Sequence, residues 1–300
     1  MAKQVNDDYP GKNKPMSDEQ LKAIATANYH SKGPNKTDND NTSKQETETQ
    51  VFQFPTEIVE LPSKGKLYPE GHPLSKGTIE MKYMSAKEED ILTNQSFIRQ
   101  GVVLDKLFKS LIVTPCEYND LLLCDKNAIM IAARVLGYGK DYTIKLKSPT
   151  TGEDISYTVD LTQLKEREID WSLHSDGKNE FHFELPASKR TVTLRLLTQR
   201  ESSQMEKETK ALQKVKKSAG TTTMLKYIIQ AIDGETDKQK IRHFIESSLL
   251  AIDSRAIRKY LKKITPDIDL TVEVPDESTG DTFRSQVNVG LDFFWPDLQV

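Results

Sequence analysis

The sequence predicts an α+β fold with two pseudo-repeated lobes of short helices, each carrying a β-hairpin, behind a disordered or extended N-terminal arm. Three observations predict this fold. A strand pattern followed by a capped helix start occurs twice, amphipathic helical patterns follow each occurrence in the same order, and each series ends in a hairpin pattern. The paired stretches are 78–92 and 191–205, 104–112 and 225–233, 125–134 and 253–262, and 142–161 and 270–289. The shared order indicates an internal duplication, and the alternative is two ordinary α+β segments that match by chance.

The first fifty residues differ in composition from the rest of the chain. They are rich in Asn, Asp, Lys, Thr, Ser and Gln and contain few side chains that could be buried. Such a stretch cannot offset the entropy of ordering by burying apolar surface. We therefore expect a disordered or partner-ordered arm over 1–50. Prolines and glycines recur over 51–77, which predicts an extended segment with turns.

Each lobe is expected to begin with a strand and a capped helix. Apolar and charged residues alternate over 79–83, as they do in a half-buried strand. Ser85 is followed three residues later by Glu88, and Thr198 by Glu201. In this capping-box spacing, each of the two side chains binds the backbone amide of the other residue. The pattern predicts helices that begin after Ser85 and after Thr198.

The remaining helices and hairpins follow in the same order in both lobes. Amphipathic patterns predict helices over the whole of 104–112 and 225–233. Asp125 and Asp253 precede the next helical pattern and are expected at its N-cap. A Thr-Gly-acid sequence lies between two alternating stretches in each predicted hairpin, at 151–153 and 279–281.

We place the first lobe at 78–169 and the second at 170–300. Ahead of its copy of the repeat, the second lobe is expected to contain a further strand, in which Phe181, Phe183 and Leu185 alternate with polar residues. Its C-terminal end is aromatic. Continued alternation from the second hairpin would place Phe293 and Trp295 inward, where they would hold the second lobe together, and Phe294 with Pro296 outward, towards a neighbouring protein.

Composition and motifs exclude several function classes. The formal net charge is −3, which gives no global basic field for nucleic acid. No stretch is long and apolar enough to cross a membrane, so we expect no membrane insertion. The two cysteines, Cys116 and Cys124, are expected to be reduced, and the histidines are scattered. Phosphate loops, nucleophile elbows and zinc spacings are absent from the sequence, which predicts no catalytic residue, no cofactor and no metal.

Three local features allow a functional interpretation beside a structural one. Glu88, Glu89 and Asp90 could act on a cation or as a general acid, but acidic residues also favour the first turn of a helix. The lysines within 210–217 could contact phosphates, or could complement the C-terminal end of a helix. Gly137 and Gly139 follow a helical pattern and fit a C-cap better than a nucleotide loop. We prefer the structural interpretation in all three cases.

Four blocks of the sequence resemble a known family. They are 61–92, 101–113, 125–142 and LDFFWPD at 291–297. Together they resemble the baseplate hub subunits and hub-assembly proteins of T4-like contractile-tailed phages, over roughly 51–300. The resemblance implies a non-enzymatic structural subunit of the baseplate hub, located in the virion tail after assembly in the host cytoplasm.

The resemblance also implies partners. They would be other baseplate or tail proteins, such as hub, tail-tube, tape-measure or spike proteins, with several copies of the chain per particle. The chain would bind them through extended segments and aromatic ends. The expected partner-binding residues are Phe52, Phe54, Leu61, Pro62, Tyr68, Pro69, Phe293, Phe294, Trp295 and Pro296.

Two other functions remain open at this point. One is a transient hub-assembly chaperone that is absent from the mature virion, which shares every sequence feature named above. The other is a tail-associated enzyme such as a peptidoglycan hydrolase. A hydrolase needs paired carboxylates in a cleft, and the spacing of acidic residues predicts no such pair.

Overall fold

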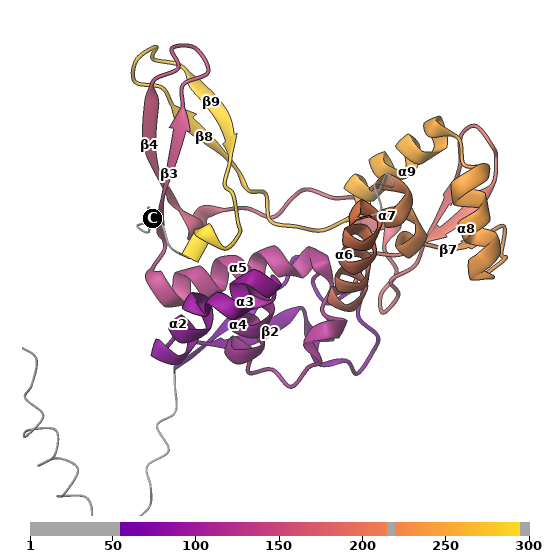
Figure 1. The fold of residues 1–300 in the computed structure, drawn as a ribbon, viewed down its shortest axis with the longest axis horizontal. Coiled ribbons are helices and arrows are strands. Elements are labelled where there is room, and N and C mark those ends of the chain that lie inside the picture. The colour runs from indigo at the N-terminus through magenta and orange to yellow at the C-terminus, as the bar shows by residue number, and fades with distance from the viewer. Residues whose placement is uncertain (1–54, 215–219, 295–300) are drawn as a thin grey trace, which may run out of the picture. The chain divides into compact units, whose positions relative to one another are not determined.

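The computed structural model describes residues 55–214 and 220–294, so the expected arm over 1–50 lies outside the described residues. The first half consists of β1 (Thr56–Glu60), η1 (Pro73–Lys76), β2 (Thr78–Lys82), α2 (Ala86–Thr93), α3 (Gln95–Gln100), α4 (Val103–Leu111), η2 (Tyr118–Asp120), α5 (Leu123–Tyr138), β3 (Asp141–Lys147), β4 (Asp154–Asp160) and η3 (Leu161–Gln163). The second half consists of η4 (Trp171–Leu173), β5 (Phe181–Glu184), β6 (Thr191–Leu194), α6 (Gln199–Lys214), α7 (Thr221–Ile228), β7 (Ile229–Ile232), α8 (Lys238–Ser247), α9 (Ala251–Ile264), β8 (Thr271–Pro275), β9 (Thr282–Gln286) and η5 (Asp292–Phe294) (Figure 1). The predicted α+β class is confirmed. We call residues 56–138 module 1 and residues 181–264 module 2.

A small antiparallel sheet lies in each module. In module 1, β2 pairs with β1, and Met81 of β2 forms an antiparallel bridge to Ile112, which follows α4. In module 2, β6 lies between β5 and β7. The second strand is therefore central in both modules. The predicted strands at 79–83 and from Phe181 are confirmed as β2 and β5.

The helix predicted over 225–233 is wrong in its second half. Helix α7 ends at Ile228, and Ile229–Ile232 is strand β7. Val192 of β6 lies opposite Ile232, and Leu194 lies opposite Ile229. Pairing with β6 buries both isoleucines, and this tertiary pairing overrides the helical period of the sequence.

Both predicted capping boxes are confirmed. The Glu88 carboxylate accepts a hydrogen bond from the Ser85 amide at 3.0 Å, and the Glu201 carboxylate accepts one from the Thr198 amide at 2.9 Å. Each carboxylate also pairs with a basic side chain at the end of the preceding strand, Lys82 at 2.8 Å from Glu88 and Arg195 beside Glu201. The duplicated element is thus a cap whose carboxylate also forms an ion pair, which the capping-box spacing alone does not predict.

The pH dependence of the first cap follows from its contacts. Burial by itself would raise the pKa of Glu88, but hydrogen bonds from Lys82, Ser110 and Ser85 outweigh it and lower the pKa to about 2. A carboxyl with a lowered folded pKa stabilises the protein above its usual pKa of about 4.5, and this contribution is lost as the pH falls towards 2. We expect Glu88→Gln to lower the free energy of unfolding by about 3 kcal/mol at pH 7 and by progressively less below pH 4.5. Urea unfolding of the wild type and of Glu88→Gln across this pH range measures the difference in unfolding free energy. A difference that stays constant with pH would contradict the lowered pKa of Glu88.

Asp125 and Asp253 were predicted as N-caps, and both predictions are wrong. Helices α5 and α9 begin two residues earlier, at Leu123 and Ala251. Each carboxylate instead binds the loop between the first two strands of its own module. The Asp125 carboxylate accepts from the amide and hydroxyl of Ser63, both at 2.9 Å.

The second module repeats this arrangement. The Asp253 carboxylate accepts from the Ala187 amide at 2.8 Å and from the Ser188 amide at 3.0 Å. The two loops read LPSK and LPASK, and their lysines have positive φ angles, 53° at Lys64 and 55° at Lys189. Because side chains rarely adopt this backbone region, its occurrence at matching positions supports the duplication independently of periodicity.

The two predicted hairpins are confirmed as β3-β4 and β8-β9, and they lie side by side (Figure 1). The Ser148 hydroxyl donates to the Asp276 carboxylate at 2.6 Å, and both side chains are buried. Ser148 and Asp276 occupy the same position in their respective turns, because each accepts a backbone hydrogen bond from the glycine four residues later. Matching positions of the two hairpins therefore contact each other.

The chain brings the second hairpin beside the first along two antiparallel segments. The Arg167 amide donates to the Asp267 carbonyl at 2.8 Å, and the Asp269 amide donates to the Lys165 carbonyl at 2.7 Å. The segment that leaves the first hairpin thus pairs with the segment that returns to the second.

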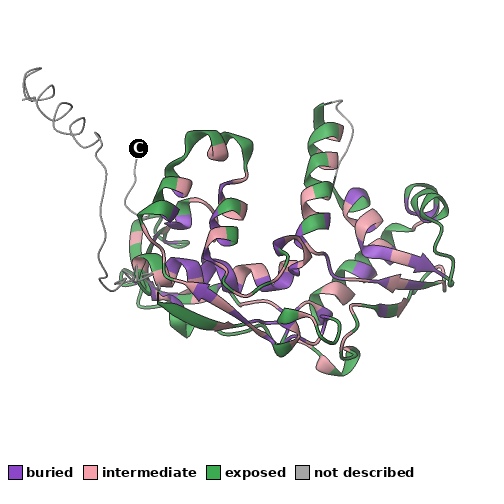
Figure 2. Ribbon diagram, turned by 90° about the horizontal axis from the view of Figure 1, so that it is seen from below, coloured by how far each residue is buried: buried purple, intermediate pink, exposed green. Residues whose placement is uncertain are grey.

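Burial varies strongly among the helices. Buried side chains concentrate on α4, α5 and the strands β2, β6 and β7, whereas α6 and the strands of the two hairpins are mainly exposed or intermediate (Figure 2). In α5 the consecutive residues Ile129, Met130 and Ile131 are all buried. A helix that is apolar on more than one face requires cover on more than one side. The sheet of module 1, the hairpin region and η5 provide contacts around α5.

Candidate interaction surfaces

The aromatic C-terminal segment packs on α5 of module 1 and on the first hairpin. Phe293 and Phe294 form the turn η5 and are 0% and 1% exposed. The ring of Phe293 lies edge-on to Tyr142 of β3, with 4.8 Å between centroids, and Nε of Arg134 on α5 donates to the Phe293 carbonyl at 3.1 Å. Trp295 and Pro296 lie outside the described residues.

These contacts correct two predictions about the C-terminal end. The strand does not continue, because β9 ends at Gln286 and a turn places both phenylalanine rings inward. Phe294 is therefore not exposed to a neighbour. Phe293 contacts α5 and the first hairpin, so it joins the end of the second repeat to elements of the first instead of closing the second lobe.

Most of the described residues proposed in the segment 51–77 are also internal. Leu61 and Tyr68 are 0% and 3% exposed, and Pro62 is buried, so none of the three is available at the surface for a partner. The Tyr68 hydroxyl donates to Asp125 at 2.8 Å and accepts from the Leu122 amide at 3.0 Å. Pro69 is exposed, and Phe52 and Phe54 lie outside the described residues.

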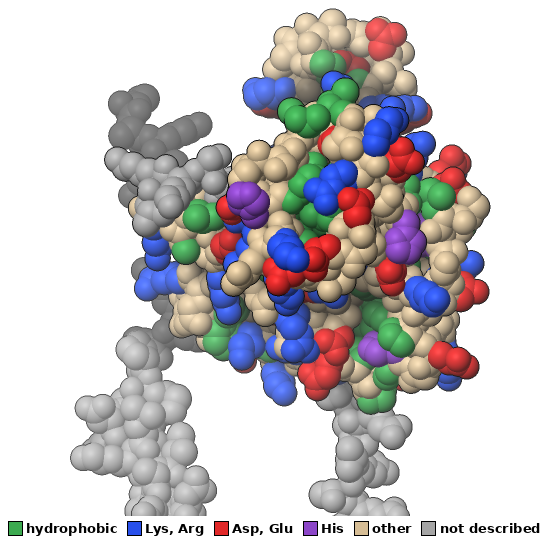
Figure 3. Space-filling model, turned by 90° about the vertical axis from the view of Figure 1, so that its right-hand side faces the viewer, with side chains coloured by type: hydrophobic (Ala, Val, Ile, Leu, Met, Phe, Trp, Pro, Cys, Tyr) green, Lys and Arg blue, Asp and Glu red, His purple; other side chains and the backbone are tan. Residues whose placement is uncertain are grey.

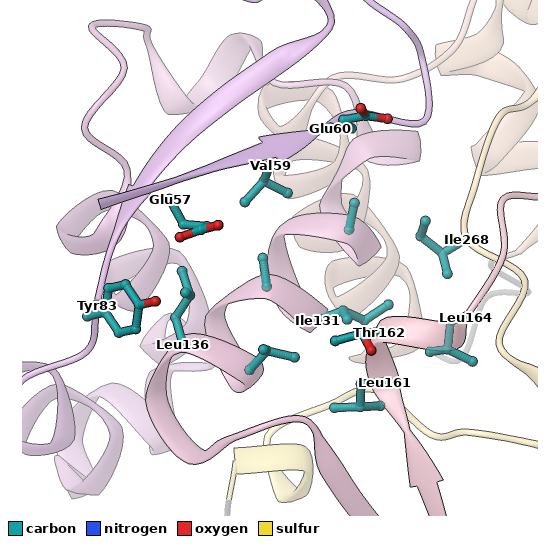
Figure 4. Close-up of a pocket in the computed structure, with 13 residues that line it drawn as sticks. Glu57, Val59, Glu60, Tyr83, Ile131, Leu136, Leu161, Thr162, Leu164 and Ile268 are labelled. Carbon is teal, nitrogen blue, oxygen red and sulfur yellow. The ribbon is translucent and has the colours of Figure 1, made fainter. Parts of the chain in front are cut away.

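An apolar groove of about 400 Å³ lies between β1, α5 and the segment after β4 (Figure 4). Val59 and Tyr83 line it from the sheet, Leu136 from α5, and Leu164 and Ile268 from the paired segments. Glu57 and Glu60 lie along its rim in Figure 4. The lining offers apolar contact and two carboxylates, and lacks the convergent polar groups that fix a small substrate. The run of apolar residues around α5 is the sequence signal that could have indicated this surface.

The two modules contact each other through a short backbone pairing. The Leu123 amide donates to the Leu197 carbonyl at 2.9 Å, and the Gln199 amide donates to the Leu121 carbonyl at 2.7 Å. Thr198 forms an antiparallel bridge with Leu122. We call residues 196–199 the docking segment of module 2 and residues 121–124 the receiving segment of module 1. Sequence patterns did not predict this contact.

Polar side chains surround this backbone pairing and bind one another across the two modules. Gln199 donates to Asp105 at 3.0 Å and accepts from Lys126 at 3.2 Å. Arg200 donates to Asp120 at 2.8 Å. An apolar centre with a polar edge is the arrangement found in protein–protein interfaces.

The described residues offer little for metal or thiol chemistry. Over 55–214 and 220–294, no three His, Cys, Asp or Glu side chains lie where they could hold a metal ion. Cys116 and Cys124 are free thiols, and burial raises the pKa of both. A raised pKa lowers the thiolate fraction, so neither thiol is activated as a nucleophile.

Positive and negative side chains are mixed at the surface of the described residues. Basic side chains are interspersed with acidic ones on the face shown in Figure 3. Of the lysine-rich stretch 210–217, Lys210 pairs with Glu206 at 2.6 Å, and residues 215–217 lie outside the described part of the chain. Within that described part, no helix is long and apolar enough to span a membrane.

The described fold thus consists of two duplicated modules that contact each other, an apolar groove and a pair of adjacent hairpins. A family model described as "T4 bacteriophage base plate protein" matches residues 54–295. Since the match spans both modules and both hairpins, the chain belongs to the T4 baseplate protein family, and its role lies in the phage baseplate. No curated protein and no solved structure matches the chain.

Proposed function

We propose that this chain is a structural subunit of the baseplate hub in a T4-like contractile tail, and that it acts by packing against other tail proteins. The observation that supports this proposal most directly is the extent of the family match, which covers the whole described fold. In this proposal the chain is assembled in the host cytoplasm and remains in the virion. Its partners are hub, tail-tube, tape-measure or spike proteins.

The proposal includes the absence of an enzymatic activity. The buried carboxylates that could act as acids or bases have structural partners. Glu88 and Glu201 bind helix caps and basic side chains, and Asp125 and Asp253 bind loop amides. A catalytic carboxylate must instead face a substrate-binding cleft.

Quantitative mass spectrometry of purified phage particles tests the structural role. We expect peptides of this chain at a fixed ratio to other baseplate proteins, and we expect the ratio to survive further purification of the particles. A chain that is required for tail assembly but absent from pure particles would instead be a transient assembly chaperone. Lysis-zone activity of the purified chain on peptidoglycan would contradict the non-enzymatic part of the proposal.

A further inference from the structure

The internal duplication supplies a second copy of each half of the module contact. The docking segment 196–199 corresponds to 83–86 in module 1, because the two capping boxes align Thr198 with Ser85. The receiving segment 121–124 corresponds to 249–252 in module 2, because the loop-binding carboxylates align Asp125 with Asp253. Within the chain, the docking segment of module 2 covers the receiving segment of module 1. The docking segment of module 1 and the receiving segment of module 2 take no part in this contact, and we call them the unused segments.

Burial separates the used halves from the unused halves. In the receiving segment of module 1, Leu122 and Cys124 are 3% and 4% exposed. Their counterparts in module 2, Leu250 and Ile252, are 50% and 60% exposed.

The two docking segments also differ in burial, and the unused one is again the more exposed. Leu196 is 6% exposed, whereas its counterpart Tyr83 is 38% exposed. Large apolar side chains exposed at both unused segments cost solvation free energy that a matching contact would recover.

The backbone groups of the unused segments also match. In the internal contact, the docking segment provides the Leu197 carbonyl and the Gln199 amide. The receiving segment provides the Leu123 amide and the Leu121 carbonyl, to which these two groups bind. The corresponding groups are the carbonyl of Met84 and the amide of Ala86, with the carbonyl of Leu249 and the amide of Ala251. None of these four groups forms a hydrogen bond with another residue that the structure describes. One docking event would therefore satisfy two donors and two acceptors.

We propose that copies of this chain bind head to tail, with Tyr83–Ala86 of one copy docked on Leu249–Ile252 of the next. The Ala251 amide donates to the Met84 carbonyl of the neighbouring copy, and that copy's Ala86 amide donates to the Leu249 carbonyl. Tyr83 covers Leu250 and Ile252. The contact repeats between chains the pairing that joins the two modules within one chain.

The geometry of such a contact is heterologous, because the two surfaces differ. Each added copy leaves one docking segment and one receiving segment open, so the assembly closes into a ring or grows as a filament. This inference concerns the isolated chain and does not rest on a role in the baseplate hub.

Sedimentation analysis of the full-length chain over a concentration series tests the inference. We expect the wild-type average mass to rise above that of one chain as concentration increases. A receiving variant, Leu250→Asp with Ile252→Asp, and a docking variant, Tyr83→Asp, should each raise the dissociation constant by about 30-fold or more. Ile58→Asp is the matched control, since Ile58 is 71% exposed and lies outside both segments. It should associate like the wild type, and circular dichroism should show all variants folded.

Mixing the two variants gives the decisive result. The receiving variant keeps its docking segment and the docking variant keeps its receiving segment, so an equimolar mixture should form a 1:1 complex that does not grow further. A wild-type chain that remains monomeric across the series would overturn the inference. So would a mixture that forms no complex, or a Tyr83→Asp variant that associates as strongly as the wild type.

Discussion

Replacing Asp125 by Ala is expected to lower the free energy of unfolding by about 3 kcal/mol at pH 7. The Asp125 side chain is fully buried and accepts hydrogen bonds from the Ser63 amide, the Ser63 hydroxyl and the Tyr68 hydroxyl. Alanine would leave the buried Ser63 amide without an acceptor and would remove the attachment of the loop to α5. Denaturant unfolding of both proteins measures this loss of free energy. We expect the dependence of the unfolding free energy on denaturant concentration to be the same for both.

Two comparison variants make this prediction specific. Asp176→Ala changes an exposed aspartate, 85% exposed in its side chain, and should change stability by less than about 0.5 kcal/mol. Asp253→Ala removes the matching carboxylate of module 2, which accepts from two loop amides, and should destabilise by an amount similar to Asp125→Ala. If Asp125→Ala were as mild as Asp176→Ala, the carboxylate would not be what holds the loop.

The effect of Asp125→Ala should also depend on pH. Burial raises the pKa of Asp125 to about 6, against the opposing effect of its three hydrogen-bond donors, from a usual value of 3.8. The folded state therefore binds more protons than the unfolded state between pH 4 and 6, and the contribution of Asp125 to stability grows as the pH falls through that window. We expect the difference between the wild type and Asp125→Ala to be larger at pH 5 than at pH 7.5. A difference that shrinks on acidification would place the folded pKa below its usual value.

The capping boxes were predictable from the sequence because their chemistry is local. Ser85 and Glu88, like Thr198 and Glu201, are three residues apart, so spacing alone places the hydroxyl and the carboxylate at the same helix end. The role of Asp125 was not predictable in this way. Its partner Ser63 lies 62 residues away in the chain, and an aspartate at a helix start has the same local signature whether it caps its own helix or binds a distant loop.

The C-terminal end and β7 show a second limit of prediction from sequence patterns. Alternation over Val287–Phe293 predicts a strand, but a strand needs a partner to satisfy its backbone groups, and β9 pairs only as far as Gln286. Where α7 gives way to β7, the apolar run at Ile228 and Ile229 fits a helix or a buried strand equally well, and only the pairing of β7 with β6 decides. The contact between the modules was missed for a related reason: backbone pairing of a loop with a helix start leaves no periodic signal in either segment.

Replacing Phe293 by Ala is expected to lower the free energy of unfolding by about 3–5 kcal/mol, the usual cost of removing a fully buried aromatic ring. The substitution leaves the Phe293 carbonyl in place for Arg134, so it isolates the contribution of the ring. Leu173→Ala serves as the comparison, because Leu173 is 38% exposed and its truncation should cost much less. Truncation after Asp292 should cost more than Phe293→Ala, because it also removes the Phe294 ring and the carbonyl that Arg134 binds.

A double-mutant cycle decides what the C-terminal turn contacts. The Phe293 ring lies edge-on to Tyr142 at 4.8 Å between centroids, and aromatic pairs in this geometry couple by about 0.5–1.5 kcal/mol. We therefore expect Phe293→Ala and Tyr142→Ala together to destabilise by that much less than the sum of the single changes. Full additivity would mean that the two rings stabilise the protein independently of each other. Coupling would mean that the end of the second repeat stabilises the first hairpin, so that truncating the C-terminal end loosens this hairpin although the removed residues belong to the second half of the chain.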